Sequence, residues 1–245
     1  MRFGIFIYDG VEPIDLATFG VLSMARRIVP EIEICLIAPY AGPVTLASGL
    51  KVIADFGIDD APPCDLVIVT GGPGWSAQAE ASATCQYIRR VHATGRIASV
   101  CTGGMILAAS GILDGGPATT KREVVPPEIS PLEVMRTKYP DIDVQEALLV
   151  DRGGGVVTGG GVSLCIDTTL HSWPTCSVST LPMRRLASWN ISGRCVPIAK
   201  GLRLSWRHNE RRYESSFSAR SGDGPVLNQR DLPCRAPAVL LFIQL

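Results

Sequence analysis

Short apolar runs alternate with segments of helical periodicity over the first 170 residues. The apolar runs are nearly continuous, which is typical of strands buried on both faces of a parallel sheet. They predict strands at residues 2–8, 32–38, 66–70, 96–100, 147–150 and 156–158. Apolar residues at helical spacing predict helices at 14–28, 77–92, 105–110, 128–138 and 162–170. This order predicts an α/β fold, a three-layer sandwich with a central, mostly parallel sheet and a small hairpin around residues 47–49.

Three loops follow predicted strands at their carboxyl ends. They comprise residues 9–15, 71–74 and 101–104. Binding sites of open parallel sheets lie at the carboxyl ends of the strands. We therefore expect these three loops to meet and to form the functional site.

The third loop carries the main candidate for chemistry. The strand before it runs directly into Cys101, and Thr102, Gly103 and Gly104 lead into an apolar helix. A sharp strand-to-helix turn of this kind is the thiol counterpart of a nucleophile elbow, and small residues permit the turn. A thiol at a helix N-terminus is expected to have a lowered pKa and to be available as thiolate. The alternative is a buried, inert cysteine.

A nucleophilic cysteine needs a pocket that stabilises developing charge. The backbone N–H of Thr102 follows the cysteine directly, and the Gly71-Gly72 loop offers further N–H groups without side chains in the way. Together they predict an oxyanion-type pocket. The alternatives are that the glycines only form a turn and that Thr102 only caps the helix.

Asp15 is the candidate proton carrier. It stands among apolar neighbours at the start of a predicted helix, where burial and a nearby thiolate would raise its pKa. Its alternative role is that of a first-turn carboxylate interacting with the helix dipole. No histidine lies close after Cys101, and the three histidines at 92, 171 and 208 have no evident site. A Cys–His–acid triad is therefore not expected, which argues against protease or amidotransferase chemistry.

The charge distribution divides the chain into two regions. The 245 residues have a formal net charge of zero, which gives no indication of a polyanionic partner for the whole chain. Residues 171–245 nevertheless hold ten Arg and one Lys against four acids, a net charge of +7, and residues 1–170 carry −7. We expect an α/β domain over residues 1–170 and a basic, weakly patterned tail over residues 171–245.

Two hypotheses account for this tail. One is an out-of-frame translation of a natural C-terminus, because the helix that begins near residue 162 stops in mid-pattern. The other is a nucleic-acid-binding extension. The tail has neither a helix-turn-helix pattern nor alternating aromatic and basic residues, so we do not expect a nucleic-acid partner.

The remaining composition favours a cytoplasmic protein without a metal site. The eight cysteines form no C-x-x-C pair and no ligand cluster with histidine. No apolar run reaches the roughly 18 residues that span a bilayer, and the N-terminus has no signal-peptide layout. We expect reduced cysteines, no membrane association and no metal site.

Several motifs together resemble those of the ThiJ/PfpI family of the class I glutamine amidotransferase-like superfamily. They are Gly71-Gly-Pro-Gly74, Ala98-Ser-Val-Cys-Thr-Gly103, Ala108-Ala-Ser-Gly-Ile-Leu113, Ala118-Thr-Thr120, Thr158-Gly-Gly-Gly161 and Ile166-Asp167. The segments around Asp15 and Cys101 are most similar to the isonitrile hydratase branch. The resemblance covers residues 1–170.

The resemblance implies a flavodoxin-like sandwich, a homodimer, a small-molecule substrate and no cofactor. It implies that Cys101 attacks the isonitrile carbon and that Asp15 moves protons. Thr102 would be the third catalytic residue, as the threonine that follows the cysteine in this branch. Gly71, Gly72, Gly103 and Thr120 would line the oxyanion and substrate pocket.

Two departures from the family pattern stand out. Lys121-Arg122 follows Thr120 where relatives usually have His-Trp, which changes one wall of the pocket. The tail also lacks the further helix with which relatives end.

We expect hydration of an isonitrile to an N-substituted formamide. Two alternatives stay open. One is glyoxalase-like chemistry on 2-oxoaldehydes through a hemithioacetal at Cys101. The other is a redox- or ligand-sensing module, such as the sensing domain of a transcription regulator, in which oxidation of the cysteine is the signal.

Overall fold

A computed structural model describes residues 1–172 of the chain. The basic tail expected from residue 171 onward lies almost wholly outside the described residues. The central sheet has seven strands in the order β10-β11-β7-β6-β1-β2-β5. These strands are β1 (Arg2–Phe6), β2 (Glu33–Ala38), β5 (Phe56–Gly57), β6 (Leu66–Val69), β7 (Arg96–Ser99), β10 (Leu149–Asp151) and β11 (Val156–Gly159). Two small two-stranded sheets are β3 (Gly42–Thr45) with β4 (Lys51–Ala54), and β8 (Pro117–Ala118) with β9 (Asp143–Val144).

The sheet is parallel except at one edge. β1 pairs in parallel with β2 and β6, β6 with β7, and β7 with β11, whereas β10 runs antiparallel to β11. All four residues of β6 are buried, as are the last four of β1, as expected for strands covered on both faces. The mostly parallel sheet and the hairpin around residues 47–49 are thus confirmed.

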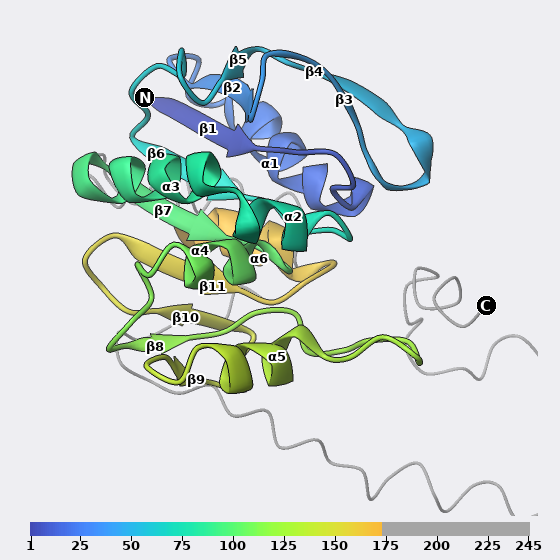
Figure 1. Ribbon diagram of the computed structural model, residues 1–245. Coiled ribbons are helices and arrows are strands. Elements are labelled where there is room, and N and C mark those ends of the chain that lie inside the picture. The colour runs from blue at the N-terminus through green and yellow to red at the C-terminus, as the bar shows by residue number, and fades with distance from the viewer. Residues whose placement is uncertain (173–245) are drawn as a thin grey trace, which may run out of the picture. The chain divides into compact units, whose positions relative to one another are not determined.

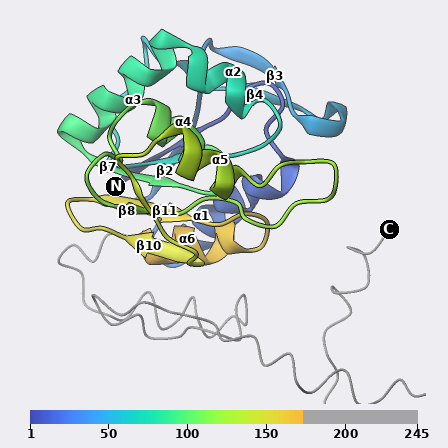
Figure 2. The same cartoon turned by 60° about the horizontal axis from the view of Figure 1, so that its bottom comes forward.

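Helices cover both faces of this sheet, as Figures 1 and 2 show. The helical elements are η1 (Pro13–Leu16), α1 (Ala17–Ala25), η2 (Ala47–Gly49), α2 (Trp75–Glu80), α3 (Ser82–Thr94), α4 (Gly103–Ala109), α5 (Pro131–Lys138) and α6 (Leu164–Ser172). α1 packs against α6 on one face, and α2 and α3 pack with α4 on the other. None of the helices within residues 1–172 is long and apolar enough to cross a membrane.

Some boundaries differ from those expected. The helix expected at 77–92 is two helices, because Ala81 takes an extended conformation (ψ 109°) between α2 and α3. The helix expected from residue 14 begins with the 3₁₀ turn η1, and the one expected from 128 begins at Pro131, where a proline is favoured in the first turn. The short strands β5, β8 and β9 were not expected, since two residues carry no detectable period.

The start of α4 packs closely against the sheet. A Cβ added at Gly103 would lie 2.2 Å from the carbonyl oxygen of Val69 at the end of β6. The absence of a side chain at this position therefore lets the helix that follows Cys101 approach the neighbouring strand. Gly20, in the middle of α1, has no atom within 4 Å of the same added Cβ.

We expect Gly103→Ala to lower the free energy of unfolding by about 1–3 kcal/mol, because the methyl group overpacks a rigid backbone contact. Gly20→Ala is the matched control and should raise it by about 0.5–1 kcal/mol, since alanine loses less backbone entropy in a helix. Urea denaturation monitored by circular dichroism measures both. Equal stability of the two variants would contradict the close packing of α4.

Candidate active site

Cys101 occupies the turn between β7 and α4. It is one of three residues other than glycine with a positive φ among the described residues, at 52°. The turn is held on both sides, because the Cys101 N–H donates to the Gly160 carbonyl (3.0 Å) and its carbonyl accepts from the Thr120 hydroxyl (2.8 Å). Such strain persists where the surroundings impose it, and it clusters at functional sites. The elbow geometry expected at Cys101 is present.

Asp15 reaches the same place from η1. Its side chain is fully buried, and its Oδ2 accepts a hydrogen bond from the Gly71 N–H at 2.7 Å. The other oxygen, Oδ1, has no hydrogen-bond partner among the described residues. An unpaired buried carboxyl oxygen is costly, so Oδ1 is available to a proton or to a bound molecule. No hydrogen bond joins Asp15 to the Cys101 thiol within residues 1–172.

The glycine loop is engaged with protein groups. The Gly71 N–H serves Asp15, and the Gly72 N–H donates to the Thr102 hydroxyl at 2.8 Å. The expectation that Gly71 and Gly72 offer free N–H groups to an oxyanion is therefore not met in this structure. The Thr102 N–H lies beside the Cys101 sulfur and favours its charged form. Thr120, expected to line the substrate pocket, uses its hydroxyl to hold the elbow.

The protonation of Cys101 differs from the expected thiolate. Burial and, after it, the negative charge of Asp15 raise the pKa of the thiol to about 12, and the Thr102 N–H only partly offsets them. The thiol is 5 % exposed, so it loses the hydration that would support a charge. The expectation of a lowered pKa is wrong for this structure, because burial outweighs the helix N-terminus.

Asp15 titrates in the neutral range. Burial, with a smaller effect from the charge of Glu12, raises its pKa from 3.8 to about 7, against the opposing effects of the hydrogen bond from Gly71 and the charge of Lys121. At neutral pH the site thus holds a protonated thiol and a carboxyl group that is about half ionised. A carboxylate in this state can accept the thiol proton during an attack.

Two further residues, Gly161 and Cys165, form walls that the sequence did not assign to the site. A Cβ added at Gly161 would lie 2.9 Å from the Cys101 sulfur and 3.4 Å from Cγ of Lys121. Cys165 on α6 is buried, and its thiol donates to the Ile14 carbonyl (3.5 Å). Burial, followed by the charge of Asp15, raises the pKa of this thiol to about 12. In the sequence, only the Thr158-Gly-Gly-Gly161 motif could have indicated that this loop lies beside Cys101.

Lys121 brings a positive charge to the site. Its charge acts on both Asp15 and Cys101 and lowers the pKa of each. The Lys121 ammonium pairs with both oxygens of the Glu128 carboxylate, at 3.0 and 3.1 Å. Its effect on Cys101 is smaller than that of burial, which remains the largest cause of the raised pKa.

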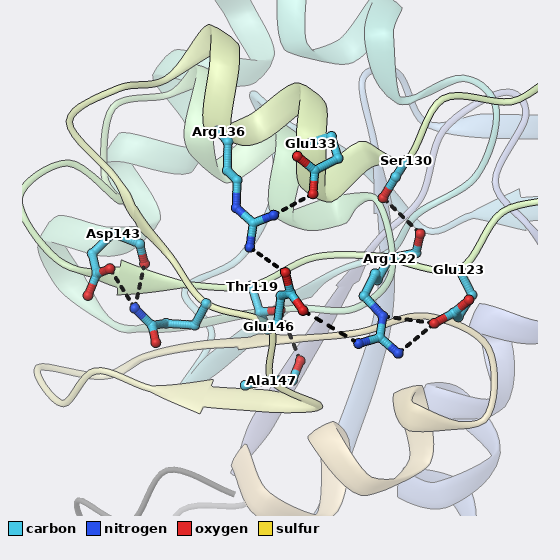
Figure 3. A network of polar contacts seen from close by, with 10 residues as sticks. Thr119, Arg122, Glu123, Ser130, Glu133, Arg136, Asp143, Glu146 and Ala147 are labelled. Carbon is cyan, nitrogen blue, oxygen red and sulfur yellow. Dashed lines mark hydrogen bonds and ion pairs between the residues drawn. The ribbon is translucent and has the colours of Figure 1, made fainter. Parts of the chain in front are cut away.

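Arg122 points into a separate polar network, shown in Figure 3. Its guanidinium pairs with Glu123 (2.6 Å) and with Glu146 (3.8 Å), and Arg136 on α5 also reaches Glu146 at 2.9 Å. The Ser130 hydroxyl donates to the Arg122 carbonyl at 2.8 Å. Exposed ion pairs contribute little stability each, so we interpret this network as fixing the path of the chain that carries Lys121.

The raised pKa of Asp15 predicts a loss of stability between pH 4 and pH 7. The unfolded carboxyl releases its proton near pH 4 and the folded one near pH 7, so the folded state binds more protons in this window and is destabilised as pH rises. Asp15→Asn removes this titration. The difference in free energy of unfolding between this variant and wild type should therefore be about 2–4 kcal/mol more favourable to the variant at pH 8 than at pH 4.

Urea denaturation at both pH values measures this effect. The matched control is Asp59→Asn, an exposed carboxylate, which should leave the pH dependence unchanged. An Asp15→Asn variant with the same pH dependence as wild type would show that Asp15 titrates in the ordinary range.

Curated proteins related to this chain include enzymes and regulators. An isonitrile hydratase from Pseudomonas putida is 29 % identical over 175 residues, covering 69 % of each chain. The transcriptional regulator GlxA of Rhizobium meliloti is 29 % identical over 192 residues, which span 78 % of this chain and 55 % of the regulator. A glutathione-independent glyoxalase from Caenorhabditis elegans is 33 % identical over 81 residues, 30 % of this chain and 44 % of the glyoxalase.

Solved structures share the fold. A ThiJ/PfpI family protein from Pseudomonas syringae superimposes with a TM-score of 0.65 at 23 % identity, covering 82 % of this chain and 78 % of that one. Drosophila melanogaster DJ-1beta gives a TM-score of 0.60 at 17 % identity, with coverage of 77 % and 96 %. The profile of the DJ-1/PfpI family matches residues 1–172, all of the described fold. The chain therefore belongs to the DJ-1/PfpI family.

Proposed function

We propose that this site adds water to an isonitrile and releases an N-substituted formamide, with Cys101 as nucleophile and Asp15 as proton carrier. The observation that carries the proposal is the fully buried Asp15 carboxyl group, which has one unpaired oxygen, a pKa of about 7 and an electrostatic effect on the elbow thiol. The similarity to the isonitrile hydratase from Pseudomonas putida supports the choice of substrate class.

The first step forms a bond between sulfur and the terminal isonitrile carbon. The Asp15 carboxylate takes the thiol proton as the sulfur attacks, because the free thiol does not ionise at neutral pH. Attack places the negative charge on the isonitrile carbon, and Asp15 returns the proton there. The product of this step is a thioimidate bound to Cys101.

The second step consumes water. Asp15 is again a carboxylate once it has protonated the carbon, so it can accept a proton as water adds to the thioimidate carbon. Asp15 passes this proton to the imine nitrogen, and the hydroxyl group of the adduct then gives its proton to Asp15 as the carbonyl forms and the carbon–sulfur bond breaks. The sulfur leaves and takes that proton from Asp15. The formamide departs, and both groups return to their starting protonation states.

The engaged glycine loop favours this reaction over acyl transfer. Acyl transfer builds charge on an oxygen and needs free donors aimed at it. The N–H groups of Gly71 and Gly72 are already used by Asp15 and Thr102. Isonitrile attack builds charge on carbon, where a returning proton, and not an oxyanion pocket, is required.

The same proposal extends to the setting of the enzyme. It places the activity in residues 1–172, with a small-molecule substrate, no cofactor, a homodimeric assembly and a cytoplasmic location. Its support is the family assignment over those residues.

The direct test is conversion of a simple alkyl isonitrile by the full chain, with formamide measured by chromatography. Cys101→Ser should abolish turnover, and Asp15→Asn should lower kcat by about 10²–10⁴, the usual contribution of a positioned acid–base group. Cys85→Ser, a buried thiol on α3 that bonds to the Ala79 carbonyl, is the matched control and should keep wild-type activity. Full activity of Cys101→Ser would overturn the proposal.

The pH dependence tests the direction of the first proton transfer. Because Asp15 must be ionised to accept the thiol proton, kcat/KM should rise tenfold per pH unit below about pH 7 and level off above it. A kcat/KM that falls as pH rises through 7 would show that Asp15 enters the reaction as an acid instead.

A ligand-sensing role is the second candidate. It is favoured by the regulator GlxA, which matches this chain at the same 29 % identity as the hydratase. A protein that binds isonitriles, protects Cys101 from alkylation and yet forms no formamide would support sensing over catalysis.

A further inference from the structure

Two cysteines meet on the sheet at a distance from the elbow. The sulfur of Cys35 on β2 lies 3.9 Å from the sulfur of Cys64, two residues before β6. β1 lies between these two strands, as Figure 1 shows. Cys64 precedes the amino end of its strand, whereas Cys101 follows the carboxyl end of β7, so the thiol pair is not part of the candidate active site.

The strand between the two cysteines leaves room for them. Gly4 pairs with Cys35 in the register of β1 and β2. A Cβ added at Gly4 would lie 3.1 Å from the Cys64 sulfur and 2.8 Å from Cδ1 of Ile37. The missing side chain at Gly4 thus provides the space in which the two thiols approach each other.

One thiol of the pair borders a surface hollow, and the other belongs to a partly exposed residue. Cys64 is partly exposed, and Cys35, 6 % exposed, lies in the wall of a hollow of about 430 Å³. Arg2 and Arg26 line the same hollow. The Arg2 guanidinium also donates to the Pro63 carbonyl at 3.3 Å, directly beside Cys64.

The surroundings make the two thiols unequal. A hydrogen bond from Cys35 and the charge of Arg2 lower the pKa of Cys64, against the opposing effects of burial and Asp65. The same contact with Cys64, together with burial, raises the pKa of Cys35. A thiol with a lowered pKa next to a thiol with a raised pKa is the arrangement in which the first cysteine is oxidised and the second resolves it.

We propose that Cys35 and Cys64 form an oxidisable dithiol that a hydroperoxide converts into a disulfide. The Cys64 sulfur attacks the peroxide, a sulfur–oxygen bond forms, the oxygen–oxygen bond breaks, and water or an alcohol leaves. The Cys35 sulfur then attacks the sulfenic sulfur, and the hydroxyl group leaves as water with the Cys35 proton. The two thiols lose two electrons, and the peroxide gains them.

Closure draws the two sulfurs from 3.9 Å to the disulfide length of about 2.05 Å. The chain around Cys64 can supply this movement, because residues 61–65 belong to no helix or strand. The disulfide would join β2 to the entry of β6 across β1.

Mass spectrometry of the full chain tests the proposal. The protein is treated with limiting hydrogen peroxide, remaining thiols are alkylated, and tryptic peptides are analysed without reduction. We expect a peptide pair linking Cys35 to Cys64, about 2 Da lighter than the two free peptides, that separates on reduction. The tryptic peptide with Cys64 also contains Cys85, so the experiment includes Cys85→Ser, which should retain the link.

Single variants test the order of events. In Cys35→Ser a 1,3-dione that traps sulfenic acids should label Cys64, and in Cys64→Ser it should leave Cys35 unlabelled. Cys101→Ser should keep the link, which separates this site from the elbow. Free Cys35 and Cys64 after a peroxide dose that fully oxidises Cys101, or a link from Cys64 to any other cysteine, would overturn the proposal.

Discussion

The candidate active site depends on the burial of one carboxyl group, that of Asp15. The buried carboxyl group of Asp15 accepts one hydrogen bond, from the Gly71 N–H. Its second oxygen has no hydrogen-bond partner in the described part of the chain. Burial moves its pKa to about 7, and its charge adds to the burial that keeps the Cys101 thiol protonated. The ionisation of the two groups is coupled, because ionising either one makes the other harder to ionise. In the proposed reaction the thiol therefore does not ionise beforehand, and its proton moves to Asp15 in the same step as the sulfur attacks.

The sheet brings these groups together, and much of that arrangement could be predicted from the sequence. The apolar runs indicated the strands, and the carboxyl ends of β1, β6 and β7 do place Asp15, Gly71 and Cys101 side by side. The Cys-Thr-Gly-Gly order indicated the turn at Cys101, which the structure shows with φ at 52°. These features are local or follow from the order of the strands. The periodicity of apolar residues and the positions of a few glycines therefore suffice to predict them.

Other features depend on burial and on contacts between distant segments, which periodicity does not reveal. The helix N-terminus predicted a thiolate at Cys101, but the 5 % exposure of the thiol reverses the sign of the shift. The sequence suggested that the Gly72 N–H has no acceptor within the protein. Only the fold shows that it donates to the Thr102 hydroxyl. The approach of Gly161 and Lys121 to the sulfur likewise depends on loops that follow different strands. Cys35 and Cys64 lie 29 positions apart and meet only because Gly4 on the strand between them has no side chain.

Family membership and local chemistry together narrow the function. The relatives include both enzymes and regulators, so the fold of this chain does not decide between the two functions. The Asp15–Cys101 pair is what favours catalysis, and its protonation is the central claim. Carbon-13 NMR of the Asp15 carboxyl carbon, assigned with Asp15→Asn and followed from pH 3 to pH 9, tests that claim most directly. The account predicts a midpoint near pH 7, and a midpoint near pH 4 would contradict it.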